Sequence, residues 1–115
     1  MSWEDGPTCG VKVRTAYRNN YESLLRPDDG IKTLAMFHSH DCGYCEATMP
    51  HFREISRYVC GNMHLVLVDV DRFDDLADEH NIEGLPTFIV FQNGKLLRRV
   101  EGYHEAEDLL KFAQG

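Results

Sequence analysis

The stretch 33–45, TLAMFHSHDCGYC, contains the features that decide the fold. Its first part, Thr33–His38, is nearly continuous in apolar character, which is typical of a strand buried on both faces. Its last part, Cys42-Gly43-Tyr44-Cys45, stands where that strand ends and where apolar residues begin to recur at helical spacing. The stretch therefore predicts a buried strand, a short loop and a helix that starts at about Cys42.

Strand and helix patterns alternate on both sides of this stretch. Asn93-Gly94, between two strand patterns, is typical of a hairpin turn, and Asp71 is a candidate cap for the helix that follows the second buried strand. The order β-α-β-α-β-α-β-β-α predicts an α/β fold with a central mixed β-sheet flanked by helices on both faces. The predicted strands cover 11–15, 33–38, 65–70, 87–91 and 95–100, and helices are expected around 21–25, from about 42, around 76–80 and around 106–113.

Length and composition indicate a single soluble domain. The 115 residues suffice for one core, and the polar residues 1–10 predict a loose N-terminal arm before a domain at 11–115. A net charge of −7 disfavours nucleic acid as a partner, and no apolar run is long enough to span a membrane. The first residues lack the features of a signal peptide, so the four cysteines favour a reducing, cytoplasmic location. We also expect a monomer.

The pair Cys42 and Cys45 is the motif with a chemical mechanism. Two cysteines three apart at a helix start lie on one face, close enough to form a disulfide. The free N–H groups and the helix dipole favour a thiolate on Cys42, while Cys45 lies one turn deeper and can attack a mixed disulfide on Cys42. Gly43 is interpreted as the residue that lets the turn close tightly. The spacing therefore favours redox chemistry.

Landmarks across most of the chain strengthen this interpretation. They follow one another in the order Leu34–His38, Cys42–Cys45, Pro50, Val68–Asp71, Gly84–Phe88 and Phe91–Lys95. In these landmarks the chain resembles the thioredoxin family, from about Val11 to its last residue.

The resemblance implies a thioredoxin fold and an activity. Pro86 matches the cis proline that lies against the CxxC motif in this family, and Leu85 matches the residue whose backbone contacts an extended substrate. The implied activity is that of a protein-disulfide oxidoreductase without a bound cofactor, in which Cys42 and Cys45 are catalytic. Its partners would be protein disulfides and a dithiol or reductase that donates electrons.

Several positions depart from the family pattern. Asp41 and Tyr44 replace the Trp and Pro of the usual thioredoxin motif, Trp-Cys-Gly-Pro-Cys. The motif Cys-Gly-Tyr-Cys is more similar to that of bacterial disulfide isomerases than to that of thioredoxins. Met36 stands at the position of the buried Asp, Leu67 at that of its Lys partner, and Glu46 replaces the Lys that often follows the second cysteine. The usual groups that handle protons near the second cysteine are therefore absent.

Two other functions fit parts of the same pattern. The lost Asp and Lys favour a non-catalytic adaptor or chaperone domain that keeps the CxxC motif. A metal or iron–sulfur site is a further alternative, because His38 and His40 precede the cysteines. We assign no metal, since a closed zinc site needs four ligands and no second CxxC is present.

The neighbours of the motif admit two interpretations each. Asp41 is interpreted as the helix N-cap, although a carboxylate there opposes a thiolate on Cys42. His40 either stabilises the thiolate and moves protons or is a plain loop residue, and Tyr44 is either a solvent-facing ring or a substrate platform. His38 is interpreted as a core residue. Two further cysteines, Cys9 and Cys60, are expected to be unpaired bystanders.

Overall fold

A computed structural model describes residues 10–59 and 61–115 of the chain. Its elements follow the predicted order, β-α-β-α-β-α-β-β-α. The strands are β1 (Val13–Thr15), β2 (Lys32–His38), β3 (Met63–Asp69), β4 (Thr87–Gln92) and β5 (Lys95–Glu101). The helices are α1 (Tyr21–Leu25), α2 (Gly43–Ile55), α3 (Asp74–Glu79) and α4 (Ala106–Gln114). The predicted loose arm, Cys9 and Cys60 fall largely or wholly outside the described residues, so those expectations stay predictions.

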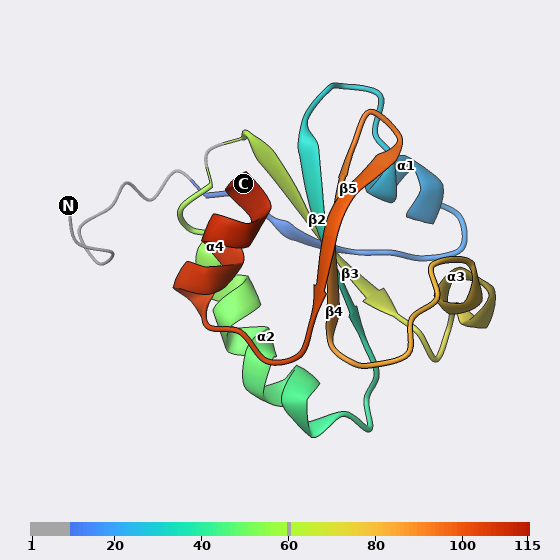
Figure 1. The fold of residues 1–115 in the computed structure, drawn as a ribbon. Coiled ribbons are helices and arrows are strands. Elements are labelled where there is room, and N and C mark those ends of the chain that lie inside the picture. The colour runs from blue at the N-terminus through green and yellow to red at the C-terminus, as the bar shows by residue number, and fades with distance from the viewer. Residues whose placement is uncertain (1–9, 60) are drawn as a thin grey trace.

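The five strands form one mixed sheet in the order β1-β3-β2-β4-β5 (Figure 1). The three strands β1, β3 and β2 are parallel, whereas β4 runs antiparallel to β2, and β5 antiparallel to β4. The hairpin between β4 and β5 turns at Asn93 and Gly94, which both have positive φ, as the predicted turn requires. The thioredoxin fold that the sequence predicts is thereby confirmed.

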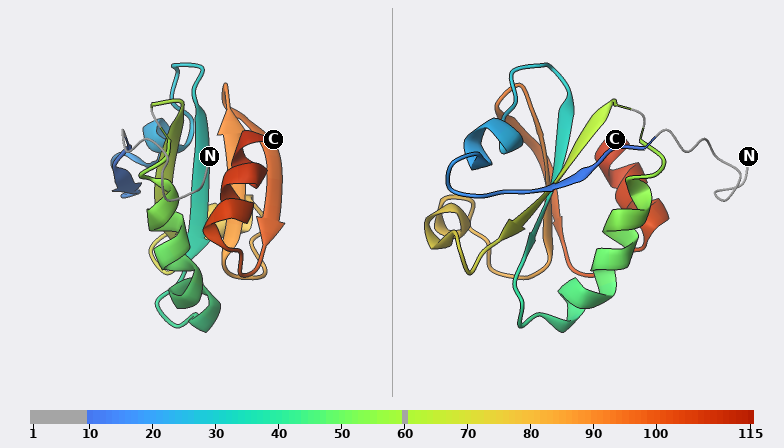
Figure 2. Two further views of the ribbon diagram at one scale, coloured as in Figure 1. Left: turned by 90° about the vertical axis from the view of Figure 1, so that its left-hand side faces the viewer. Right: turned by 180° about the vertical axis from the view of Figure 1, so that it is seen from behind.

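Helices cover both faces of the sheet. In Figure 1 the helices α2 and α4 lie to the left of the sheet, and α1 and α3 lie to the right; Figure 2 shows the same layers from two other sides. The side chains of the buried strands alternate between the two faces, as the two-residue period of a strand requires. Leu34 and Met36 belong to the cluster beneath α2 and α4, whereas Ala35 and Phe37 belong to the cluster on the opposite face.

The strand register places the candidate site at one edge of the sheet. His38 ends β2 and is the register partner of Asp69, which ends the parallel strand β3. The loops that follow these two strands therefore start side by side, and α2 begins in the first of them. No helix in the described part of the chain is long and apolar enough to cross a membrane.

The predicted role of Asp71 at the start of α3 is wrong. The helix begins at Asp74, and Phe73 is the residue at its N-cap position. Asp71 instead accepts hydrogen bonds from the loop that precedes α2. The carboxylate lies two residues too early to cap α3, and it faces the neighbouring loop because β2 and β3 end together.

Candidate active site

Cys42 and Cys45 form a disulfide at the start of α2, with their Cα atoms 5.1 Å apart. Cys42 is the N-cap of the helix, and its sulfur accepts a hydrogen bond of 3.1 Å from the backbone N–H of Cys45. The Cys42 side chain is partly exposed, whereas Cys45 is only 2% exposed. Cys45 is therefore the more deeply buried of the two residues, in agreement with its predicted place one turn deeper in the helix.

Two expectations about the turn itself are wrong. Cys42 occupies the N-cap position that was predicted for Asp41, and the carboxylate of Asp41 instead lies 3.4 Å from Nε2 of His40. The helix starts one residue later than the cap pattern indicates, so a sulfur takes the place of an oxygen. Gly43 is not needed to close the turn either, because a Cβ atom there would meet nothing within 4 Å.

His40 is held by a carboxylate from the neighbouring loop. Its Nδ1 donates to Oδ2 of Asp71 over 2.6 Å, and the same oxygen accepts a hydrogen bond of 2.9 Å from Oγ of Ser39. The backbone N–H of His40 also points to this oxygen at 3.4 Å. Asp71 therefore fixes the loop that leads into Cys42. The sequence alone predicts neither Asp71 nor Ser39 as a residue of the site.

These contacts change the protonation of both groups. The hydrogen bond with Asp71 raises the pKa of His40 above its usual value, and the charges of Asp41 and Asp71 add to the rise. The hydrogen bond from Ser39, together with those from His40, lowers the pKa of Asp71. The pair therefore favours an imidazolium two residues before Cys42. Both ring nitrogens of His40 therefore face carboxylates, those of Asp41 and Asp71, and a role for this residue at Cys42 stays a prediction.

The loop before β4 contains the predicted cis proline. The Leu85–Pro86 peptide bond is cis, as the family resemblance implies. Leu85 packs against the same apolar cluster as Cys42. The carbonyl of Pro86 accepts a hydrogen bond of 2.8 Å from the N–H of Gly102, so the loop after β5 lies next to Pro86. The binding of substrate at Leu85 and Pro86 stays a prediction.

Two aromatic rings near these elements face solvent. Tyr44, inside the CxxC motif, is 68% exposed, so its ring faces solvent, and its role as a substrate platform stays a prediction. Tyr103 follows Gly102 and is 43% exposed, and its hydroxyl lies 2.9 Å from Nε2 of His51 on α2. Tyr103 was not predicted as a site residue, because only the pairing of Gly102 with Pro86 brings it to this side of the molecule.

The sheet beneath Cys45 is apolar. Met36 and Leu67 are register partners on β2 and β3, both are buried, and both belong to the cluster that contains Cys45. The two positions at which the family has a buried Asp and a Lys therefore meet in the fold, as an apolar pair. No acid or base lies at either position to exchange a proton with Cys45.

An open groove of about 660 Å³ runs beside Cys45. His38, predicted as a core residue, is half-buried and lines this groove, because the end of β2 reaches the edge of the sheet. The remaining lining residues come from the loop before α2 and from α2 itself: Ser39, His40, Glu46, Met49, Pro50 and Arg53.

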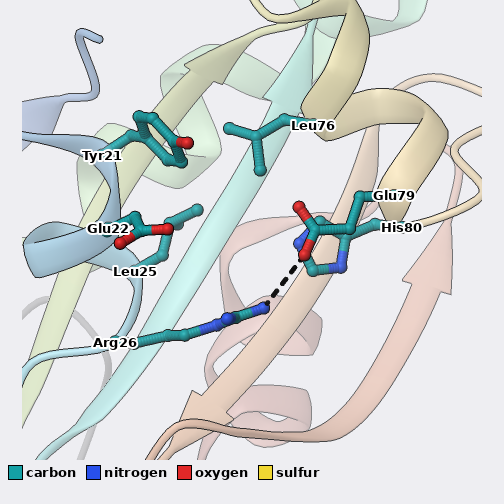
Figure 3. A pocket seen from close by; sticks show the side chains of 7 residues that line it. All are labelled: Tyr21, Glu22, Leu25, Arg26, Leu76, Glu79 and His80. Atoms are coloured by element: carbon teal, nitrogen blue, oxygen red, sulfur yellow. Dashed lines mark ion pairs between the residues drawn. The ribbon is translucent and has the colours of Figure 1, made fainter.

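A smaller cavity lies between α1 and α3, on the other face of the sheet (Figure 3). Its volume of about 10 Å³ is enough for one water molecule. His80 borders it, and the Arg26–Glu79 ion pair, 3.7 Å long, closes one side (Figure 3). Within the described residues, no group of three or more His, Cys, Asp or Glu side chains is placed to hold a metal ion.

Comparisons with known proteins agree with this geometry. The family model described as Thioredoxin matches residues 12–115. The chain is 30% identical over 106 residues to thioredoxin Y, chloroplastic, of Oryza sativa subsp. japonica, and the match covers 92% of the chain and 62% of the relative. It is 29% identical over 113 residues to protein disulfide-isomerase A5 of Mus musculus, which covers 96% of the chain and 22% of that relative. The chain thus spans less than two thirds of the length of either relative.

A solved structure gives the same result for the fold. The thioredoxin of Malassezia sympodialis superimposes with a TM-score of 0.78 at 25% sequence identity, over 91% of this chain and 90% of that chain. The segment matched by the family model, residues 12–115, includes the strand before the CxxC motif, the disulfide and the cis-proline loop. The chain therefore belongs to the thioredoxin family.

Proposed function

We propose that the chain is a thiol–disulfide oxidoreductase that acts on protein disulfides. The observation that carries this proposal is the Cys42–Cys45 disulfide at the start of α2, with one sulfur accessible and the other covered. Membership of the thioredoxin family supports the same activity, as does the similarity to a protein named as a disulfide isomerase.

In the reduced protein, Cys42 is the attacking thiolate. The N–H of Cys45 donates to its sulfur, and the free N–H groups of the first turn of α2 favour negative charge at the start of the helix. The preceding loop holds the imidazolium of His40, which is paired with the carboxylates of Asp41 and Asp71. Attack on a substrate disulfide gives a mixed disulfide on Cys42 and releases one substrate thiolate.

Cys45 then completes the exchange. Its thiol loses a proton and its sulfur bonds to that of Cys42, while the bond between Cys42 and the substrate breaks and the electron pair leaves on the substrate sulfur. The substrate disulfide is reduced to two thiols, and the protein holds the Cys42–Cys45 disulfide. A dithiol or a reductase returns two electrons, and no bound cofactor takes part.

An assay of insulin reduction in the presence of dithiothreitol tests this activity. The wild-type chain should speed the precipitation of reduced insulin, and both Cys42→Ser and Cys45→Ser should lose most of that rate. The alternative of a non-catalytic adaptor, which the apolar pair Met36 and Leu67 favours, predicts no acceleration by the wild type. We further propose a monomer in the cytoplasm; light scattering of the purified chain tests the monomer.

A further inference from the structure

The apolar surroundings of Cys45 leave its proton without an evident acceptor. Met36 lies between Leu67 on β3 and Phe88 on β4, and all three side chains are buried in the cluster that contains Cys45. Burial among apolar groups disfavours a thiolate, so a thiol in this position is a weak nucleophile at neutral pH. The attack by Cys45 therefore requires a base from another direction.

His38 lies on the correct face of the sheet to supply that base. Leu34 and Met36 point into the cluster beneath α2, and the two-residue period of the strand places His38 on the same side. His38 is thus one position further along the same row as Met36, at the end of β2 that opens to solvent. It lines the groove of about 660 Å³ together with Cys45.

The protonation state of His38 suits a base. Burial lowers the pKa of His38 below the usual 6.5, and the charge of Arg53 lowers it further, although Asp69 and Asp71 oppose these effects. The imidazole is therefore neutral at neutral pH. Within the described residues, no hydrogen bond holds its ring nitrogens, so one of them has a lone pair available.

The charged groups around the ring favour the product of proton transfer. Asp69 on β3 is the register partner of His38, and Asp71 lies in the loop that follows. On the side of α2 the groove presents Arg53 and Glu46, and His40 lines it from the loop before the helix. The two aspartates stabilise an imidazolium at His38, whereas the charge of Arg53 destabilises it.

We propose that His38 is the general base that takes the proton from Sγ of Cys45, directly or through one water molecule in the groove. The proposal rests on the proposed thiol–disulfide exchange. As the proton moves to the imidazole, the Cys45 sulfur bonds to the Cys42 sulfur, and the bond from Cys42 to the substrate breaks. The electron pair leaves on the substrate sulfur, and the imidazolium then gives its proton to that thiolate or to water. The two cysteines are oxidised, and the substrate disulfide is reduced.

Rapid mixing of the reduced full chain with less than one equivalent of the disulfide reagent DTNB separates the two attacks. The first release of thionitrobenzoate reports the attack by Cys42 and depends on concentration. The second release reports the intramolecular attack by Cys45 and does not. Acid quenching and mass spectrometry of peptides show whether the intermediate is carried on Cys42.

The variant His38→Gln should slow only the second phase. We expect a loss of about 100-fold at pH 7, which is the size of a general-base contribution, and a first phase within about twofold of wild type. In the wild type, the rate of the second phase should decrease at pH values below the pKa of His38 and should not change with pH above it. In His38→Gln it should rise about tenfold per pH unit through the neutral range, because the thiolate of Cys45 must form without help.

Two further variants control this result. His64→Gln removes a half-exposed histidine that pairs with Asp29 at the opposite end of the sheet, and it should leave both phases unchanged. Free imidazole should restore part of the second phase in His38→Ala, since the groove is open. An unchanged first phase shows that the variants are folded.

Two results would overturn the role of His38. One is a second phase in His38→Gln within about twofold of wild type at pH 7. The other is a second phase that is slower in His38→Gln by the same factor at every pH, which would indicate a structural role. A wild-type chain with no second phase would instead refute the proposed function, and the role of His38 with it.

Discussion

The carboxylate of Asp71 lies 2.6 Å from Nδ1 of His40 and joins the loop after β3 to the loop that leads into Cys42. The same oxygen accepts from Ser39, so one carboxylate fixes two consecutive residues beside the disulfide. The same contact therefore fixes the position of the loop before Cys42 and favours the protonated form of His40 in that loop. Replacing the carboxylate should therefore change both the pKa of His40 and the reactivity of Cys42.

In Asp71→Asn, the pKa of His40 should fall toward its usual value of about 6.5, because the hydrogen bond to the carboxylate is the largest cause of its rise. A titration of the His40 ring signals by NMR measures this shift. The rate of alkylation of Cys42 at pH 7 should change by no more than a few-fold, since the substitution removes a negative charge while it weakens the protonation of His40, and exposed charges are screened. Asp29→Asn, which removes the partner of His64 instead, is the matched control. An unchanged titration of His40 in Asp71→Asn would contradict this role.

The effect of this pair on stability has a defined sign. A histidine with a raised pKa stabilises the folded state at pH values below its unfolded pKa, and that contribution is lost as pH rises through the folded pKa. The contribution of His40 should therefore decline above about pH 6.5. Asp71, whose pKa is lowered, contributes above about pH 3.8 and loses its contribution as pH falls further. Unfolding by urea as a function of pH in wild type and Asp71→Asn measures both trends.

The order of alkylation tests the assignment of the two cysteines. Iodoacetamide at neutral pH should label Cys42 before Cys45 in the reduced chain, because Cys42 is partly exposed and caps the helix, whereas Cys45 is 2% exposed. We expect a difference in rate of at least about tenfold. Mass spectrometry of peptides after short exposures gives the two rates. Earlier labelling of Cys45 would reverse the assignment.

The position of Tyr44 predicts a more oxidising pair than in a typical thioredoxin. Proline stands there in the reducing members of the family, and Cys-Gly-Tyr-Cys is similar to the isomerases. We expect a potential between roughly −250 and −180 mV, above the value of about −270 mV for thioredoxin. Equilibration with glutathione buffers measures it, and Tyr44→Pro should lower it by about 30 mV or more, equivalent to about 1.4 kcal/mol. A wild-type value at or below that of thioredoxin would show that the residue does not have this effect.

His80 predicts a loss of stability in acid. Its side chain is packed against the rings of Phe37 and Phe91, it is 9% exposed, and burial lowers its pKa. Below about pH 6.5 the unfolded chain therefore binds more protons than the folded chain, so the free energy of unfolding decreases as the pH is lowered in that range. His80→Leu should reduce this slope, and it should change the free energy of unfolding at pH 7 by no more than about 1 kcal/mol, because the buried Nε2 of His80 has no hydrogen-bond partner to lose among the described residues. Denaturant unfolding between pH 7.5 and 5 measures both effects, and an unchanged slope would contradict the prediction.

The sequence predicts the fold well because local patterns determine it. The stretch Thr33–His38 is nearly continuous in apolar character, and the hairpin turn at Asn93-Gly94 needs only two residues with positive φ. The redox pair is also local, since its two cysteines lie on one helical turn. The family resemblance adds Pro86, whose importance depends on its contacts in the fold.

Contacts between loops were harder to predict. The sequence favours Asp71 as the cap of the helix that follows it, because the sequence does not show which loop lies beside Asp71, although the ends of parallel strands meet at one edge of a sheet. Asp41 was assigned the cap position that a sulfur occupies. His38 looked like a core residue because a strand end can face either the core or a groove, and only the fold decides between them.

Trapping of a mixed disulfide tests most directly whether Cys42 attacks protein disulfides and Cys45 completes the exchange. The reduced variants Cys45→Ser and Cys42→Ser are incubated with insulin, quenched with acid and analysed by mass spectrometry of peptides under non-reducing conditions. We expect Cys45→Ser to accumulate a covalent adduct in which Cys42 is linked to an insulin cysteine, and Cys42→Ser to accumulate none. The absence of an adduct in Cys45→Ser, or its appearance on Cys45 in Cys42→Ser, would contradict the account.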